Sequence, residues 1–421
     1  MRRLLLVGLL LILVALSAAF LFAQDAPTDP EELLTARGVH VQPLEVVTES
    51  AVQILDIGSD SARLNFIGTV PLACTVVYGT TTDFGSASID QNMNGGAIVE
   101  HNPIMINLEP DTEYFYRVEV DGDVSERVRS VRTAPTPEQP TPLRIALGSC
   151  SRLLPQPIFT PILAAQPDLF LFVGDNNYAN TRFRAALRWN YQRFRRLRER
   201  ADLLAGTPTL AIWDDHDFLA NNSNGTCPGR DEALAAFREY WANPAYGLPD
   251  APGVFFRHRW GATELFMLDC RMYRPDVGDA GRTCTPEPDP PALPISGGPL
   301  GPDQEAWLFD ALGASDATFK LVACGSRFTP AGSLDSWASF PEARARLLQA
   351  LEDDAIGGVV FLSGDIHRSL FSLVPGVAYS VPEIVSSPLA TARSSCNPNA
   401  PGQLTCYDAS DSFVVLDIDP T

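Results

Sequence analysis

Trp213-Asp214-Asp215-His216-Asp217 is the stretch that decides how the whole chain is interpreted. It follows a mostly apolar run, residues 207–212, which we interpret as a buried strand. Burying unpaired charge is strongly unfavourable, so four ionisable side chains at the end of such a strand predict that something positive is bound there. A metal centre is the simplest explanation.

Three other predicted strands end in the same way. Residues 144–147 lead to Cys150, residues 170–174 lead to Asp175 and Tyr178, and residues 358–364 lead to Asp365 and His367. Since α/β folds place their chemistry beyond the carboxyl ends of buried strands, we expect these side chains to converge. Carboxylate, phenolate and thiolate groups with little imidazole suit calcium or iron better than zinc.

Each strand end has an ordinary structural interpretation when it is taken alone. A single Gly-Asp end can be only a turn or a helix cap, and a single buried cysteine such as Cys150 is commonly a small core residue. His216 or His367 alone could be a hydrogen-bonded structural histidine. The occurrence of several such ends in one domain favours the metal centre.

Composition limits the class of protein. The chain has 421 residues, 45% of them hydrophobic, which predicts two or three folded domains and argues against disorder. A formal charge of -20 excludes general binding to nucleic acid or anionic lipid, both of which favour basic surfaces. An anionic substrate would need local positive charge, and bound cations can supply it.

The N-terminus resembles an export leader. Residues 1–23 begin with Arg2-Arg3 and continue as an uncharged apolar run, which predicts a signal peptide or, if it stays uncleaved, a membrane anchor. Residues 24–42 read as a tether. An exported chain with eight cysteines should contain disulfides, and we predict Cys396–Cys406 first and Cys227–Cys284 second.

Two folded domains are expected after the tether. Residues 43–135 show short alternating segments separated by turns, which predict a small all-β sandwich. A Pro-rich linker at 136–143 precedes residues 144–421, where strands and helices alternate and predict an α/β core that is largely parallel, with helices outside. Helices are expected at 182–204, 230–241, 302–312 and 341–351.

The segment 182–200 carries eight arginines. They could attract anionic substrates, but we interpret the segment as a solvated helix whose arginines pair with acidic neighbours.

The motifs together resemble those of a known family. Gly174-Asp175-Asn176-Asn177-Tyr178, the Trp213 stretch with its later Asn222, and Gly364-Asp365-Ile366-His367 are similar to the motifs of the PhoD-like alkaline phosphatases, members of the metallophosphoesterase superfamily. Asp217 stands where that family has glutamate, and Cys270 stands where it has threonine. Residues 107–116 resemble the tyrosine corner of fibronectin type III domains.

The resemblance implies a fold, a reaction and a site. The fold is a metallophosphatase-type layered sheet core flanked by helices, and the reaction is hydrolysis of phosphate monoesters, and also of diesters, by attack of a metal-bound hydroxide. Fe³⁺ and Ca²⁺ are the implied cofactors, and a small-molecule phosphate ester is the implied partner. The implied ligands are Cys150, Asp175, Tyr178, Asp215, Asp365 and His367.

The implied catalytic residues are His216, which contacts the phosphate or protonates the leaving group, with Asn222 and Arg230 as phosphate contacts. Arg271 and Arg274 are either phosphate contacts or structural ion-pair partners. Export places the protein in the periplasm, outside the cell, or anchored on the outer side of a membrane. The alternatives are a phospholipase-like diesterase and a non-catalytic surface-binding protein.

Overall fold

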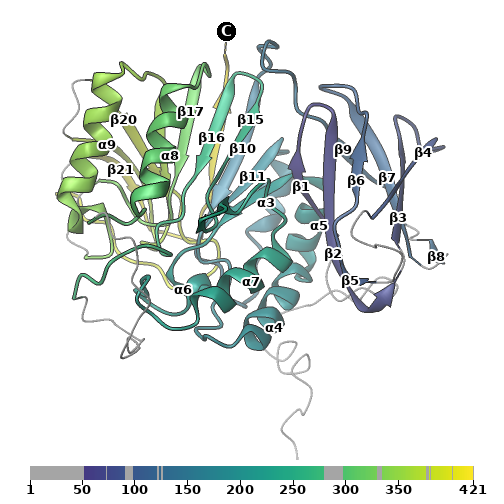
Figure 1. The fold of residues 1–421 in the computed structure, drawn as a ribbon, viewed down its shortest axis with the longest axis horizontal. Coiled ribbons are helices and arrows are strands. Elements are labelled where there is room, and N and C mark those ends of the chain that lie inside the picture. The colour runs from purple at the N-terminus through teal and green to yellow at the C-terminus, as the bar shows by residue number, and fades with distance from the viewer. Residues whose placement is uncertain are drawn as a thin grey trace, which may run out of the picture.

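A computed structural model gives the fold (Figure 1). It describes residues 52–72, 74–90, 98–120, 123–124, 127–278, 297–329, 334–375, 379, 381–400 and 402–420. The predicted leader at 1–23 and tether at 24–42 lie outside these residues, as does Cys284. In the described part of the chain, no helix has the length and apolar character that crossing a membrane requires.

The first folded part is a β-sandwich, as the alternating pattern predicted. One sheet runs β1-β2-β5 with β6 beside β2, and the other runs β4-β3-β7-β8 with β9 beside β7. Alternate residues of β7, namely Tyr114, Tyr116 and Val118, are buried because side chains alternate between the faces of a strand. The strands are β1 Gln53–Ile57, β2 Ser61–Leu72, β3 Cys74–Gly79, β4 Ser86–Ile89, β5 Ile98–His101, β6 Ile104–Ile106, β7 Glu113–Val120, β8 Asp123–Val124 and β9 Arg129–Arg132.

The predicted tyrosine corner has a matching contact. The backbone N–H of Glu109 donates a hydrogen bond to the hydroxyl of Tyr114 across 2.9 Å. A tyrosine hydroxyl bonded to backbone a few residues upstream is a feature of immunoglobulin-like sandwiches. The resemblance to fibronectin type III domains stays a prediction.

The α/β part contains two layered sheets. The first has the order β12-β11-β10-β22, with β10, β11 and β12 parallel and β22 antiparallel to β10. The second has the order β15-β16-β17-β18-β20-β19-β21, with β16, β17, β18 and β20 parallel. The strands are β10 Leu143–Gly148, β11 Leu169–Val173, β12 Thr209–Ile212, β13 Gly247–Leu248, β14 Ala251–Pro252, β15 Phe256–Trp260, β16 Thr263–Met267, β17 Phe319–Ala323, β18 Val359–Ser363, β19 Ser369–Val374, β20 Val381–Val385, β21 Gln403–Tyr407 and β22 Val414–Ile418.

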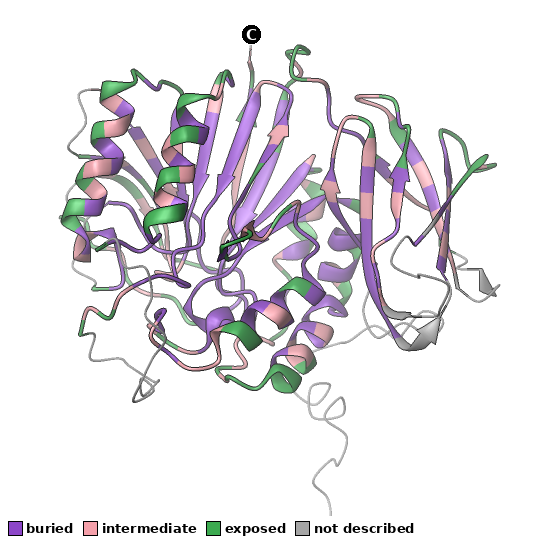
Figure 2. Cartoon of the chain, in the orientation of Figure 1, coloured by how far each residue is buried: buried purple, intermediate pink, exposed green. Residues whose placement is uncertain are grey.

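Alternation along β16 explains the layers. Leu265 and Met267 belong to the apolar cluster shared with the first sheet, whereas Phe266 belongs to a second cluster with residues of α8 and α9. The strands are therefore buried on both faces, and the outer faces of the helices are exposed (Figure 2). The predicted α/β class with its layered sheet core is confirmed.

Three of the four predicted helices are present close to their expected bounds, whereas α3 and α6 were not predicted. They are α3 Phe159–Ala164, α4 Arg184–Arg195, α5 Arg198–Gly206, α6 Asp215–Phe218, α7 Arg230–Tyr240, α8 Pro302–Gly313 and α9 Pro341–Asp353, with a 3₁₀ turn at Trp337–Ser339. Figure 1 shows α8 and α9 on the side of the core opposite the β-sandwich. The single helix expected at 182–204 is wrong, because the backbone of Leu197 is extended and divides it into α4 and α5.

The arginines of this segment divide into two sets. Arg182, Arg184 and Arg198 are exposed, as predicted, and Arg188 is partly exposed, whereas four others are buried, namely Arg193, Arg195, Arg196 and Arg200. Arg195 is 1% exposed and donates from Nη1 to Oδ1 of Asn65 at 2.6 Å, which ties α4 to the β-sandwich. Arg200 is fully buried, with its guanidinium carbon 4.7 Å from the centre of the Phe172 ring. Arg184 and Arg188 do pair with an acidic neighbour, Glu239. The buried arginines are therefore structural, and Arg195 links α4 to the β-sandwich.

Two disulfides involve only described residues. Cys396–Cys406 is present and confirms the first predicted pair. Cys270–Cys324 was not predicted and joins the segments that follow the parallel strands β16 and β17. Cys227 is disulfide-bonded, but the predicted partner Cys284 is not described, so that pairing stays a prediction. Cys74 and Cys150 are free and buried.

Candidate metal centre

The carboxyl ends of strands from both sheets meet at one place. The parallel register of β10, β11 and β12 aligns their ends, and the backbone N–H of Ser151 bonds to the carbonyl of Asp175 at 2.9 Å. The other sheet approaches through Gly364, where an added Cβ would lie 2.6 Å from the side chain of Ser149. Glycine is required here because the loops after β10 and β18 are in contact.

The loops at these ends hold unusual backbone conformations. Cys150, Asp175, Asn222, Asp365 and His367 all have positive φ, between 56° and 67°. Such conformations are costly for residues other than glycine, and they cluster at functional sites where the surrounding structure enforces them. All five were predicted as site residues from the sequence.

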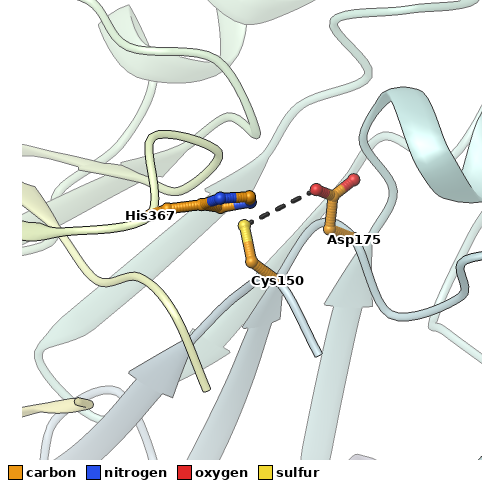
Figure 3. Close-up of side chains that lie close together, drawn as sticks. All are labelled: Cys150, Asp175 and His367. Atoms are coloured by element: carbon orange, nitrogen blue, oxygen red, sulfur yellow. Dashed lines mark hydrogen bonds between the residues drawn. The ribbon is translucent and has the colours of Figure 1, made fainter. Parts of the chain in front are cut away.

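Asp175 accepts hydrogen bonds from three of its neighbours, and Figure 3 shows its carboxylate facing the thiol of Cys150. Its Oδ2 accepts hydrogen bonds from the hydroxyl of Tyr178 at 2.8 Å and from Sγ of Cys150 at 3.5 Å. Its Oδ1 accepts from the backbone N–H of His216 at 3.2 Å. Figure 3 shows the ring of His367 beside the same thiol.

Three overlapping groups have ligand atoms within 4.8 Å of one another. They are Cys150, Asp175 and His367; Asp175, Asp215 and His216; and Asp214, Asp215 and Asp365. Asp175 and Asp215 each belong to two groups, so they are the residues able to bridge neighbouring ions. The structure therefore brings together all six residues that the sequence predicted as ligands, since Tyr178 contacts Asp175.

Asp215 supplies a test of whether a cation fits. Its Oδ2 accepts the backbone N–H of Asn222 at 2.6 Å, whereas its Oδ1 is buried and has no hydrogen-bond partner. A buried carboxylate oxygen without a partner is costly. A cation bound between Asp215 and its neighbouring carboxylates would satisfy that oxygen, so the donor set fits hard metal ions.

The pKa shifts of the clustered acidic groups also indicate that the site binds cations. Burial, followed by the neighbouring carboxylates, raises the pKa of Asp175 and of Asp365 well above the usual range. Burial and Asp175 raise the pKa of the Cys150 thiol and of the Tyr178 phenol. This concentration of acidic groups is unfavourable without positive charge, and bound cations would reverse these shifts.

Asp214 and Asp217 are held by structural contacts. Oδ1 of Asp214 accepts from Nε of Arg271 at 2.6 Å. Asp217 accepts from the backbone N–H of Asn176 at 2.9 Å and from the hydroxyl of Tyr191 at 3.0 Å. The aspartate in place of the family's glutamate thus stabilises the loops around the cluster.

The predicted catalytic residues differ in their positions. His216 lies with its ring centre 4.2 Å from that of Tyr178, and its Nδ1 is hydrogen-bonded to Oδ1 of Asn180. Asn222 lines a cavity beside Asp365 and His367. The contacts described for Arg230 lie elsewhere, with Nη1 donating to the carbonyl of Gly225 at 3.3 Å and Nε 3.8 Å from Asp231.

Arg271 and Arg274 take the structural alternative that the sequence left open. The fully buried guanidinium of Arg271 bonds to Asp214 at 2.6 Å and to Asp335 at 2.8 Å. Arg274 lies 2.7 Å from the other oxygen of Asp335.

Sequence reasoning missed three residues near the site. Asn180 orients His216, while Arg327 and Arg368 line the cavity beside Asp365. Arg368 directly follows His367, and that position was the available signal. Arg327 follows β17, whose end leads into Cys324, Gly325 and Ser326 without a carboxylate or a histidine, so no pattern in the sequence indicated it.

Comparisons with known proteins agree with this geometry. Residues 180–411, more than half of the chain, match the sequence profile of the PhoD-like phosphatases. Alkaline phosphatase D of Bacillus subtilis is 28% identical over 309 residues, 62% of this chain and 52% of that protein. The match therefore spans about half of the length of that relative.

Solved structures show the same fold. A structure of PhoD has a TM-score of 0.73 and 20% identity, covering 90% of this chain and 86% of that one. A purple acid phosphatase from yellow lupin (Lupinus luteus) seeds has a TM-score of 0.65 and 13% identity, covering 89% of this chain and 71% of that one.

Proposed function

Because the chain belongs to the PhoD-like phosphatase family, we propose that it is an exported, metal-dependent hydrolase of phosphate monoesters. The observation that carries the proposal is the convergence of Asp175, Asp215 and Asp365 from strand ends of two sheets. An otherwise negative protein could accept a negative ester at this place only with bound cations.

The proposed ligands are six side chains that meet at this place: Cys150, Asp175, Tyr178, Asp215, Asp365 and His367. Cys150, Asp175, Tyr178 and His367 would hold the iron, because thiolate and phenolate suit ferric ion. Asp215 and Asp365 offer the oxygen ligands that calcium prefers. When bound, the cations would lower the pKa of a coordinated water and offset charge on the phosphoryl oxygens.

The protein's own residues would orient the ester. Asn180 and the Tyr178 ring fix the plane of His216, so its free ring nitrogen can contact the phosphate or the leaving oxygen. Asn222 is held by its backbone contact with Asp215 and adjoins the cavity, which supports a role in phosphate binding. We do not extend that role to Arg230, whose contacts lie elsewhere.

The proposed metal centre could cleave either phosphate monoesters or phosphate diesters, so an experiment must distinguish them. A diesterase or phospholipase-like activity would use the same cations and differ only in the group that leaves. A non-catalytic surface-binding protein would not need a cluster of buried acidic groups, so the cluster argues against it.

Export and domain organisation complete the proposal. The apolar leader at 1–23 supports export, and so do the disulfides, because disulfides persist mainly in oxidising compartments. We propose that the sandwich at 43–135 positions the catalytic part at 144–421. Its buried contact from Gln53 to Thr209, 2.7 Å, supports a rigid attachment.

One experiment tests the proposal directly. Purified protein should contain iron and calcium by elemental analysis and should hydrolyse para-nitrophenyl phosphate faster than bis(para-nitrophenyl) phosphate. Faster cleavage of the diester would favour the diesterase. Metal far below stoichiometric content, with neither ester cleaved, would overturn the enzymatic proposal.

A further inference from the structure

A cavity of about 260 Å³ opens beside Asp365 and His367. It is formed by the loops that follow α6, β17 and β18, by residues just before the 3₁₀ turn at Trp337–Ser339, and by the segment after β20. Its lining residues are Asn222, Arg327, Asp335, Ser336, Asp365, Ile366, His367, Arg368 and Ser394. Two of them are arginines that the proposed chemistry does not use.

Arg327 is buried without a counter-ion in contact. It is 3% exposed, and its Nε has no hydrogen-bond partner. The nearby carboxylate of Glu383 accepts instead from the backbone N–H groups of Phe328 and Thr329, at 2.7 and 2.8 Å. A buried guanidinium that lines a cavity and leaves a nitrogen without a hydrogen-bond partner is suited to bind an anion.

Arg368, which follows the neighbouring strand β18, also has a buried nitrogen without a hydrogen-bond partner. Its Nη1 makes a long contact of 3.4 Å with the carbonyl of Ile366, and its Nε is buried without a partner. Within the described part of the chain, no carboxylate lies within ion-pair distance of Arg368 or of Arg327.

The acidic groups of the cavity do not cancel this charge. Asp335 is bonded to Arg271 and Arg274, at 2.8 and 2.7 Å. Asp365 faces the proposed metal centre. The cavity therefore offers two guanidinium groups that have no carboxylate in direct contact, next to the place where a phosphoryl group would bind.

We propose that Arg327 and Arg368 form an anion subsite that holds a second phosphate of the substrate. This inference rests on the proposed function and narrows its substrate class. A cavity smaller than the roughly 300–1,000 Å³ of drug-sized pockets suits a single charged group rather than a whole cofactor. The favoured substrates thus carry two phosphates on a short linker, as a bisphosphorylated sugar or polyol does.

The test measures binding, so it does not depend on turnover. Alkane bisphosphonates with linkers of two to four carbons, and alkyl monophosphonates of matched length, are titrated into the metal-loaded protein by calorimetry. The wild type should bind the best bisphosphonate more tightly than its monophosphonate. Arg327→Gln and Arg368→Gln should each reduce this preference, by roughly 10- to 100-fold for a charge-assisted hydrogen bond.

Arg144→Gln is the matched control. Arg144 lies in β10, at the end away from Cys150, and pairs with Asp417 on the surface, so its loss should leave the preference intact. Arg368→Gln keeps the test valid if Arg327→Gln does not fold, because Arg368 is only partly buried and its replacement should disturb the fold less.

The outcomes separate the two proposals. Equal binding of both phosphonates by the wild type, or a full preference retained in both arginine variants, would overturn the subsite. An intact bisphosphonate preference in a protein that cleaves no phosphate ester would support the subsite and overturn the proposed function.

Discussion

The hydroxyl of Tyr178 donates a hydrogen bond to Oδ2 of Asp175 across 2.8 Å. The same oxygen accepts from the Cys150 thiol, so a phenol, a thiol and a carboxylate converge within a buried site. The proposed centre uses these three groups as ligands of one ion, because thiolate with phenolate is a donor set that suits ferric iron.

Tyr178→Phe should therefore remove the visible absorption that a phenolate bound to Fe³⁺ produces. If the phenolate binds Fe³⁺, the metal-loaded wild type has a phenolate-to-iron charge-transfer band in the visible spectrum, and the variant lacks it. Tyr191→Phe is the matched control, because Tyr191 bonds to the structural Asp217 at 3.0 Å and its loss should leave the band. A colourless, metal-loaded wild type would argue for a metal other than Fe³⁺.

Asp175→Asn should abolish hydrolysis of para-nitrophenyl phosphate and reduce the bound metal while the fold survives. An amide keeps the shape of the carboxylate but removes the charge that two of the candidate groups share. Elemental analysis and circular dichroism report the metal and the fold. Asp168→Asn alters the other end of the same strand and should keep its metal. Full activity in Asp175→Asn would reject the centre as drawn.

Arg271→Met should lower the free energy of unfolding by about 3–5 kcal/mol, because it leaves the buried carboxylate of Asp214 without its counter-ion and leaves Asp335 with Arg274 alone. Urea unfolding measures the loss. Arg257→Met should cost less than about 1 kcal/mol, since Arg257 is exposed and 3.8 Å from Glu264. Unchanged stability in Arg271→Met together with weaker phosphate binding would favour the phosphate-contact alternative.

The apolar strands were predictable because they are buried on both faces. β11 and β18 begin and end within one residue of the runs that predicted them, and the ionisable residues just after them mark the site. The helix boundary at Leu197 was not predictable in this way. It depends on where Arg195 and Arg200 find partners in the β-sandwich and among aromatic rings, which no local pattern encodes.

Contacts between the ends of separate strands also could not be predicted from the sequence. The Cys270–Cys324 pair depends on the parallel alignment of β16 with β17, which sequence spacing does not reveal. Arg327 was missed for the same reason, because its importance comes from a cavity that several distant segments build together.

Replacing both cysteines of a disulfide by alanine should destabilise the protein more for Cys270–Cys324 than for Cys396–Cys406. Their sequence separations are 54 and 10 residues, and a longer closed loop constrains the unfolded chain more. The chain-entropy relation gives about 4 and about 3 kcal/mol. Urea unfolding of the two double variants makes the comparison, and a larger loss for Cys396–Cys406 would contradict the entropic account.

His258 should make stability sensitive to pH. It is buried in β15, where burial lowers its pKa below 6.5 although Asp56 acts in the opposite direction. The unfolded chain therefore takes up a proton first as the pH falls below about 6.5, which costs stability on the acid side and nothing above it. Melting temperatures measured above and below pH 6.5 test this: as the pH falls below 6.5, the melting temperature should fall more steeply in the wild type than in His258→Gln.

Asp56→Asn extends this pH test. Asp56 has a positive φ of 45°, which asparagine tolerates, so the backbone should be preserved. Removing its charge takes away the one interaction that favours protonated His258 in the folded state, so the pKa of His258 should fall further and the acid-side loss should become steeper. A wild type whose melting temperature falls no more than that of His258→Gln would contradict the assignment, since the titration would then come from other groups.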